Sequence, residues 1–125
     1  MTADGWRITD DPLTLTYGDG NLFVDLGAER GAIAAEKGEQ KIAVEVQSFL
    51  SQSPVHDLEL AVGQFEVYRV VLREMEPDRV LHLAVPSRVY KTLLVAPLGQ
   101  LIISNVKLRL LVFDENKGVV LQWIS

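Results

Sequence analysis

Polar and apolar residues alternate along much of the N-terminal half of the chain, and a period of two is typical of β-strands. The pattern is clear in residues 6–9, 13–17, 22–26 and 41–49. Residues 31–35 either continue the sheet or form a short irregular piece. Residues 18–21, with the sequence GDGN, separate two of these strands and are typical of a hairpin turn. The first half is therefore predicted to form a sheet that contains a hairpin.

The spacing of apolar residues changes to that of a helix after Ser53. Ser53 and Pro54 are suited to the start of a helix, and Pro77 is predicted to end it. The helix is expected to bury one face, which carries Leu58, Ala61, Val62, Phe65, Leu72 and Met75.

Three further strands are predicted in the rest of the chain. Residues 79–85 and 108–113 are almost continuously apolar, which is typical of strands inside a sheet. Residues 119–124 are predicted to close the chain as a strand. Between the first two, Ser87 is suited to cap a helix that reaches residue 95, and Leu98 to Ser104 add a turn or two.

This order of elements indicates an α/β (α+β) fold, a mixed sheet flanked by helices, in a single domain over residues 1–125. Hydrophobic residues make up 48% of the chain and the mean hydropathy is +0.16, so one core can be filled. Cysteine is absent, which excludes disulfides and thiolate metal sites. No signal peptide or membrane-spanning run is present, and a soluble, cytoplasmic protein is expected.

The net charge of −5 argues against broad nucleic-acid binding through charge. It leaves room for a local basic strip, or for carboxylates whose charge is cancelled by a divalent ion. The cations away from the acidic residues discussed below are interpreted as a solvated surface, and they are Arg69, Arg73, Arg88, Lys91, Lys107 and Arg109.

Glu45 and Gln47 interrupt the strongly apolar stretch KIAVEVQSF, and side chains two apart on a strand share one face. A carboxylate in an apolar strand is costly unless it is paired or binds a cation. Asp25 poses the same question at the end of the strand LFVDL. If these strands are adjacent, Asp25 and Glu45 can hold Mg²⁺ or Mn²⁺, with Glu36 as a weaker third ligand. The metal and its waters can then supply the nucleophile for phosphodiester cleavage.

Each of these residues also has a structural interpretation. Asp25 can accept backbone hydrogen bonds at a strand end, and Glu45 can form a buried ion pair with Lys37 or Lys41. Gln47 can be a plain polar strand residue, and Glu36 a surface residue. His56 is predicted to be exposed in the first turn of a helix, and His82 to lie on a sheet face or in the core.

Asp25 followed by Glu45-Val46-Gln47 resembles the Asp…Glu-x-Lys signature of the restriction-endonuclease-like, PD-(D/E)XK superfamily. Gln64 and Tyr68 resemble the Gln-x-x-x-Tyr element that follows it in several nuclease branches, although a helix face that only packs on the sheet is the alternative. The chain is more closely similar to XisH proteins, the cyanobacterial fdxN-element excision controlling factors. The blocks that carry this resemblance are GWRITDDPLT, LFVDLGAE, AAEKGEQKIAVEVQSF, DLELAVGQF, EPDRVLHLAVP, APLGQL and LRLLVFD.

The resemblance implies a nuclease-type core and an accessory role in programmed DNA rearrangement during heterocyst differentiation. It implies Asp25 and Glu45 as ligands of Mg²⁺ or Mn²⁺, Gln47 as a water- or phosphate-holding residue, and Gln64 with Tyr68 in substrate placement. It also implies a XisI companion protein, with DNA and a site-specific recombinase as further partners. The alternative is a nuclease fold without catalysis that serves as a scaffold for XisI or the recombinase.

The chain departs from the family in two respects. The family generally has lysine where this chain has Gln47, and glutamine brings no positive charge to a reacting phosphate. The family also usually has a helix before the Gly-Trp pair, whereas four residues precede Gly5 here. That helix is expected to be missing, and an apolar patch left uncovered would favour self-association. Nuclease activity is therefore expected to be weak or lost.

Overall fold

The computed structural model describes residues 5–10, 15–19, 22–26 and 33–124. Six strands form one mixed sheet in the order β1-β4-β5-β6-β7-β8. Their bounds are β1 (Arg7–Asp10), β4 (Ile33–Lys37), β5 (Gln40–Val46), β6 (Arg79–Pro86), β7 (Leu110–Asp114) and β8 (Val119–Ile124). The strands β2 (Leu15–Asp19) and β3 (Leu22–Leu26) pair antiparallel in a separate two-stranded sheet, which confirms the predicted hairpin.

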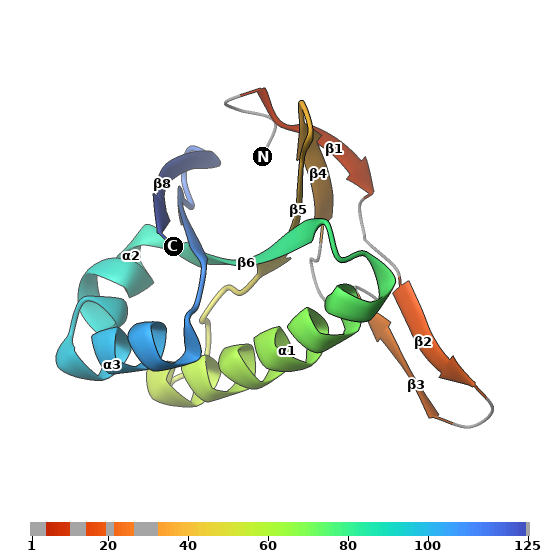
Figure 1. The fold of residues 1–125 in the computed structure, drawn as a ribbon. Helices are drawn as coiled ribbons and strands as arrows, with labels where there is room; N and C mark the ends of the chain where they lie inside the picture. Colours follow the sequence, from red (N-terminus) through yellow and green to blue (C-terminus); the bar gives the residue numbers. More distant parts are fainter. Residues whose placement is uncertain (1–4, 11–14, 20–21, 27–32, 125) are drawn as a thin grey trace.

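The centre of the large sheet is parallel and its edges are antiparallel. β5, β6 and β7 run parallel, and β1, β4 and β8 join them as antiparallel strands. Parallel strands need a crossover connection, and the helices between β5 and β7 supply it. The sheet is curled: the helices lie on one side of β6, and β8 rises opposite the β4–β5 hairpin on the other side (Figure 1). We call these the helical face and the concave face of the sheet.

The long helix α1 (Pro54–Met75) begins and ends close to where the sequence predicts. The hydroxyl of Ser53 accepts a hydrogen bond of 3.2 Å from the backbone N–H of His56, which satisfies one of the free donors of the first turn. The predicted buried face is confirmed for most of its residues. Met75 is the exception, since it is 41% exposed in the last turn of the helix.

The second crossover is formed by α2 (Ser87–Val89), the π-helix η2 (Tyr90–Leu94) and α3 (Pro97–Val106). The prediction that Ser87 caps this helix is wrong. Ser87 is the first residue of the helix, Pro86 is the N-cap, and no side chain hydrogen-bonds to the first turn. α3 is longer than the turn or two expected. Gly99 is needed where it meets η2, because a Cβ there would collide with the Leu93 carbonyl oxygen.

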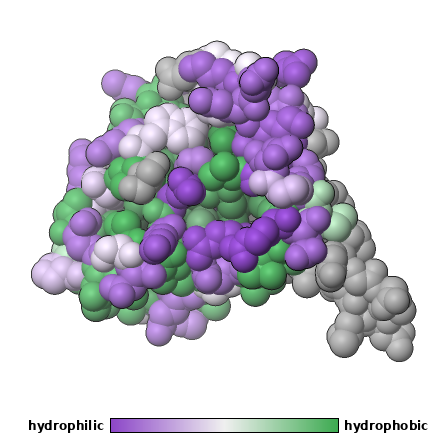
Figure 2. Space-filling view, viewed as in Figure 1, coloured by the Kyte–Doolittle hydropathy of each residue, from purple (hydrophilic) through white to green (hydrophobic). Residues whose placement is uncertain are grey.

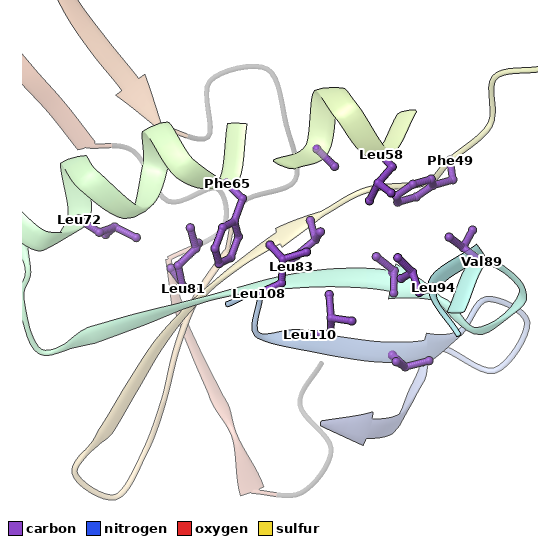
Figure 3. Packing of buried hydrophobic residues seen from close by; sticks show 14 of the residues in the cluster. Phe49, Leu58, Phe65, Leu72, Leu81, Leu83, Val89, Leu94, Leu108 and Leu110 are labelled. Atoms are coloured by element: carbon purple, nitrogen blue, oxygen red, sulfur yellow. The ribbon is translucent and has the colours of Figure 1, made fainter. Parts of the chain in front are cut away.

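Two hydrophobic clusters lie on opposite faces of the sheet. The larger packs α1, η2 and α3 against the helical face, with Phe65, Leu72, Leu83 and Leu110 at its centre (Figure 3). The smaller lines the concave face with Ala35, Ile42, Val44, Ala84 and Leu111. The period of two in β5 and β6 divides their side chains between these clusters. The mixed α+β architecture predicted from the sequence is confirmed.

Among the described residues, no single helix has both the length and the apolar character to cross a membrane. Two consecutive helical segments, residues 87–94 and 97–106, reach these limits only together, and they are bent by 100° at their junction.

Candidate functional site

Glu45 and Gln47 lie at the C-terminal end of β5, on the helical face of the sheet. Ile42 and Val44 point to the concave-face cluster, so Ala43 and Glu45 point toward α1. β5 is shorter than the predicted strand over residues 41–49 and ends at Val46. Gln47 nonetheless continues the sheet, since its backbone N–H donates to the Ala84 carbonyl at 3.0 Å.

A chain of hydrogen bonds joins three of the residues singled out in the sequence. The Gln47 amide nitrogen donates to Glu45 Oε1 at 3.0 Å and to Gln64 Oε1 at 2.8 Å. The Glu45 side chain is fully buried, and Gln47 is 8% exposed. This confirms that Glu45 and Gln47 share one face, and it brings Gln64 of α1 to the same place.

α1 supplies the other half of this cluster. Gln64 and Tyr68 are one turn apart, so they share a face of the helix. Tyr68 is half-buried and packs against the larger hydrophobic cluster. Glu45, Gln47, Gln64 and Tyr68 each make interactions beyond the hydrogen bonds given above. We refer to these four residues as the Glu45 cluster.

The turn after Gln47 is held in an unusual conformation. Phe49 is buried and adopts a left-handed backbone with φ of 53°, which is costly for a residue with a Cβ. Arg88 secures it by donating to the carbonyl oxygens of Ser48, at 2.5 Å, and Phe49, at 3.2 Å, and by pairing with Glu115 at 2.8 Å. The sequence gives no signal for this contact, because Arg88 lies about forty residues away.

Asp25 lies on β3, where its register partner is Thr16 of β2, and its side chain falls outside the described residues. The expectation that Asp25 and Glu45 occupy adjacent strands of one sheet is wrong. β3 pairs with β2 in the small sheet, whereas β5 lies between β4 and β6. The joint role of Asp25 and Glu45 therefore stays a prediction.

Glu36 is engaged elsewhere. Its carboxylate pairs with Arg79 at 3.5 Å and with Arg7 at 3.6 Å. It stands opposite Lys41 in the β4–β5 register, four residues from Glu45, which is about 13 Å along a strand. Arg79 is itself buried and donates to the Ile42 carbonyl at 2.9 Å. These contacts give Glu36 a structural role and separate it from Glu45.

The described residues supply one buried carboxylate to the Glu45 cluster, and they contain no group of three histidine, cysteine or acidic side chains placed to hold a metal. Carboxylate and amide oxygens suit Mg²⁺ or Mn²⁺, which keep several waters. Such an ion at Glu45 would therefore depend on a second carboxylate from outside this group, and Asp25 is the predicted one.

His56 is 62% exposed and His82 is buried, as expected.

A model of the XisH family, described as XisH protein, matches residues 1–121. The chain belongs to the XisH family. It is similar to the crystal structure of an XisH family protein from Nostoc punctiforme, with 41% identity, 98% of this chain and 90% of that chain covered, and a TM-score of 0.84. It is also similar to a fdxN element excision controlling factor protein from Anabaena variabilis, with 46% identity, coverage of 98% and 89%, and a TM-score of 0.84. No curated protein matches the chain.

Membership of the XisH family agrees with the resemblance found in the sequence. The Glu45 cluster also relates the polar residues in the strand KIAVEVQSF to one another: Gln47 donates to the buried Glu45 carboxylate, and Gln64 accepts the second amide hydrogen of Gln47. Gln47 donates to Glu45 as an ammonium would, without adding a charge.

Proposed function

We propose that this XisH-family chain is an accessory factor that controls the programmed excision of a DNA element, as in heterocyst differentiation. The related Anabaena variabilis protein is named for control of fdxN element excision. The observation that carries the proposal further is the bond from Gln47 to Glu45 beneath α1. A polar cluster buried in an apolar layer is costly, so its presence here favours a role in recognition or chemistry rather than in stability alone.

The proposed site has a nuclease-type, PD-(D/E)XK ancestry. Asp25 and Glu45 would bind Mg²⁺ or Mn²⁺, which supplies charge stabilisation to a bound DNA phosphate. Gln47 would hold a water or a phosphate oxygen, and Gln64 with Tyr68 would place the substrate. Because Gln47 is uncharged, cleavage would be slow or absent, and the site would serve mainly to bind DNA within a recombinase complex.

Calorimetric titration with Mn²⁺ tests the cation part of this proposal. The wild-type chain should bind Mn²⁺, and Glu45→Ala should abolish binding, since it removes a ligand. Glu39→Ala is the matched control because Glu39 is an exposed carboxylate on the β4–β5 turn. Equal Mn²⁺ binding by the Glu45 variant and the wild type would exclude the site.

A plasmid-nicking assay with Gln47→Lys tests the ancestry. The variant restores the charge that the signature carries, so it should raise nicking in the presence of Mn²⁺ above the wild-type rate. Gln122→Lys adds the same charge at an exposed position on β8 and should change nothing. Nicking that rises equally in both variants would reflect charge alone and would remove the support for a nuclease site.

The second candidate is a non-catalytic scaffold that binds the XisI companion protein or the recombinase. Both amide hydrogens of Gln47 are already donated, to Glu45 and to Gln64, so neither is left for a phosphate unless a bond breaks. Co-purification with XisI distinguishes the two candidates. If scaffolding is the function, Glu45→Gln should retain XisI and still support excision in cells. Loss of excision with XisI still bound would favour the first candidate.

A further inference from the structure

The concave face of the sheet holds a cleft of about 590 Å³, on the side opposite the Glu45 cluster. We call it the tryptophan cleft, and we define it by Trp6, Lys37, Val80, His82, Arg109 and Trp123. It forms because the curled sheet brings Trp6, just before β1, close to Trp123 of β8. Figure 2 shows pale and apolar residues between hydrophilic ones in the upper half of the molecule, where Figure 1 places β8 opposite the β4–β5 hairpin.

Three aromatic rings meet in this cleft. The ring centroids of Trp6 and Trp123 are 5.8 Å apart with a tilt of 34°, and His82 approaches Trp123 edge-on at 5.1 Å. Trp123 is 36% exposed, so an aromatic surface remains available to a ligand. Indole faces of this kind stack on planar, electron-rich or cationic rings. The cleft therefore has an aromatic platform rather than a plain apolar wall.

His82 forms part of the wall of the cleft. The residue is 9% exposed, and its Nδ1 is shielded from solvent, so a ligand in the cleft meets the ring rather than that atom. Burial lowers the pKa of His82 to about 4; a hydrogen bond with the Val80 backbone partly opposes the shift, and the charge of Arg109 adds to it. The imidazole is thus neutral at pH 7, and the neutral ring extends the aromatic wall beside Trp123.

The rim of the cleft is charged and carries more cations than anions. The cations that line it are Lys37, Lys41 and Arg109, and the anions are Glu39 and Asp78. A purely apolar ligand would leave these charges unmatched. An aromatic platform and a rim with a net charge of about +1 are complementary to a planar heterocycle that bears an anionic group.

We propose that the tryptophan cleft binds a nucleotide, with its base stacked on the tryptophan pair and its phosphate at the Lys37 and Arg109 side. The ring of His82 lines the cleft beside the base. The volume lies within the range of about 300 to 1,000 Å³ that small-molecule sites span. The same chemistry is offered by a free mononucleotide and by one unpaired nucleotide of a DNA strand. This site lies on the other face of the sheet from the Glu45 cluster and is independent of the proposed function.

The chain is suited to a direct test, because both of its tryptophans lie in the cleft. Intrinsic fluorescence, excited at the red edge of tryptophan absorption, is titrated with dAMP, with adenosine and with a short single-stranded DNA. A saturable change with dAMP identifies a free nucleotide as ligand, and a saturable change only with the oligonucleotide identifies an unpaired nucleotide of a strand. Adenosine should bind more weakly than dAMP, since it lacks the anionic group.

Two lysine variants supply the matched control. Lys37→Ala should weaken binding about tenfold, the usual effect of losing one charge-assisted hydrogen bond. Lys91→Ala removes an equally exposed cation on η2 and should leave binding unchanged. The proposal is overturned if neither dAMP nor the oligonucleotide gives a saturable change, or if the two lysine variants bind alike.

Discussion

The two faces of the sheet use polar residues in opposite ways. On the helical face, Glu45 is sealed under α1, and its Oε1 accepts a hydrogen bond from Gln47, which in turn bonds Gln64. On the concave face, His82 lies beside Trp6 and Trp123 in an open cleft, and Trp123 is 36% exposed. The first arrangement is covered by a helix, whereas the second borders space that a ligand can enter. Burial alone therefore does not distinguish a structural polar group from one that lines a binding site; the space in front of it does.

The largest expected difference between the two faces concerns their packing. Phe65→Ala should lower the free energy of unfolding by about 4 kcal/mol, because it opens a cavity under a fully buried ring. Phe113→Ala makes the same change on the concave face, where the ring is only half-buried, and should cost clearly less. Urea denaturation of both variants measures this. A cost for Phe113→Ala equal to that of Phe65→Ala would contradict the view that the concave face is the open one.

The next prediction concerns pH and the concave face. The pKa of His82 is about 4 in the folded protein, against 6.5 for an unperturbed histidine. Between these values the unfolded chain binds more protons, so stability should fall as the pH drops from 6.5 to 4. The loss attributable to His82 is up to about 3 kcal/mol. Arg109 and Lys41, which line the same cleft, oppose the added charge, while Asp78 favours it.

Denaturation as a function of pH, compared between wild type and His82→Leu, isolates this contribution from that of the carboxylates. The variant should lose less stability than the wild type over the acidic range. His56→Gln is the control, because His56 is the only other histidine and is exposed. Parallel pH profiles for the wild type and His82→Leu would mean that His82 accepts its proton without cost, and the cleft would then be more polar than described.

On the helical face, Gln47→Leu should destabilise the protein by about 2 kcal/mol, because Glu45 Oε1 and Gln64 Oε1 lose a shared donor in a buried place. Gln122→Leu is the matched control on the exposed side of β8 and should be close to neutral. Thermal melting at neutral pH measures both. A neutral Gln47→Leu would show that Glu45 does not depend on this amide, and the Glu45 cluster would lose its structural basis.

The sequence was informative where periodicity was strong. It predicted the hairpin, the start and end of α1, β8 and the shared face of Glu45 and Gln47, because these depend on neighbours in the chain. It did not reveal Trp6 and Trp123 as one site, although they are the only two tryptophans. Their contact depends on the curl of the whole sheet. The clamp of Arg88 on the Phe49 turn was missed for the same reason.

The sequence also misplaced features for local reasons. Ser87 has the side chain of a helix cap, but β6 continues through Pro86, so the helix begins one residue earlier than expected. The sequence suggested that Asp25 and Glu45 lie on neighbouring strands, because both residues interrupt apolar strands. Strand pairing is not encoded in that pattern, and β3 pairs with β2 instead of joining the large sheet. The tertiary contacts, rather than propensity, decide both cases.

The smallest expected effect tests whether the two faces are independent. Ser53→Ala removes the hydroxyl that accepts from His56 N–H, and should cost about 1 kcal/mol of stability because a donor of the first turn of α1 loses its partner. Ser53→Asp keeps an acceptor at that position and should recover most of the loss. Since α1 covers only the helical face, the tryptophan emission of the folded protein should stay unchanged in both variants. A shift in emission for Ser53→Ala would mean that the cap of α1 is coupled through the sheet to the concave face, and the two sites would then have to be treated as one.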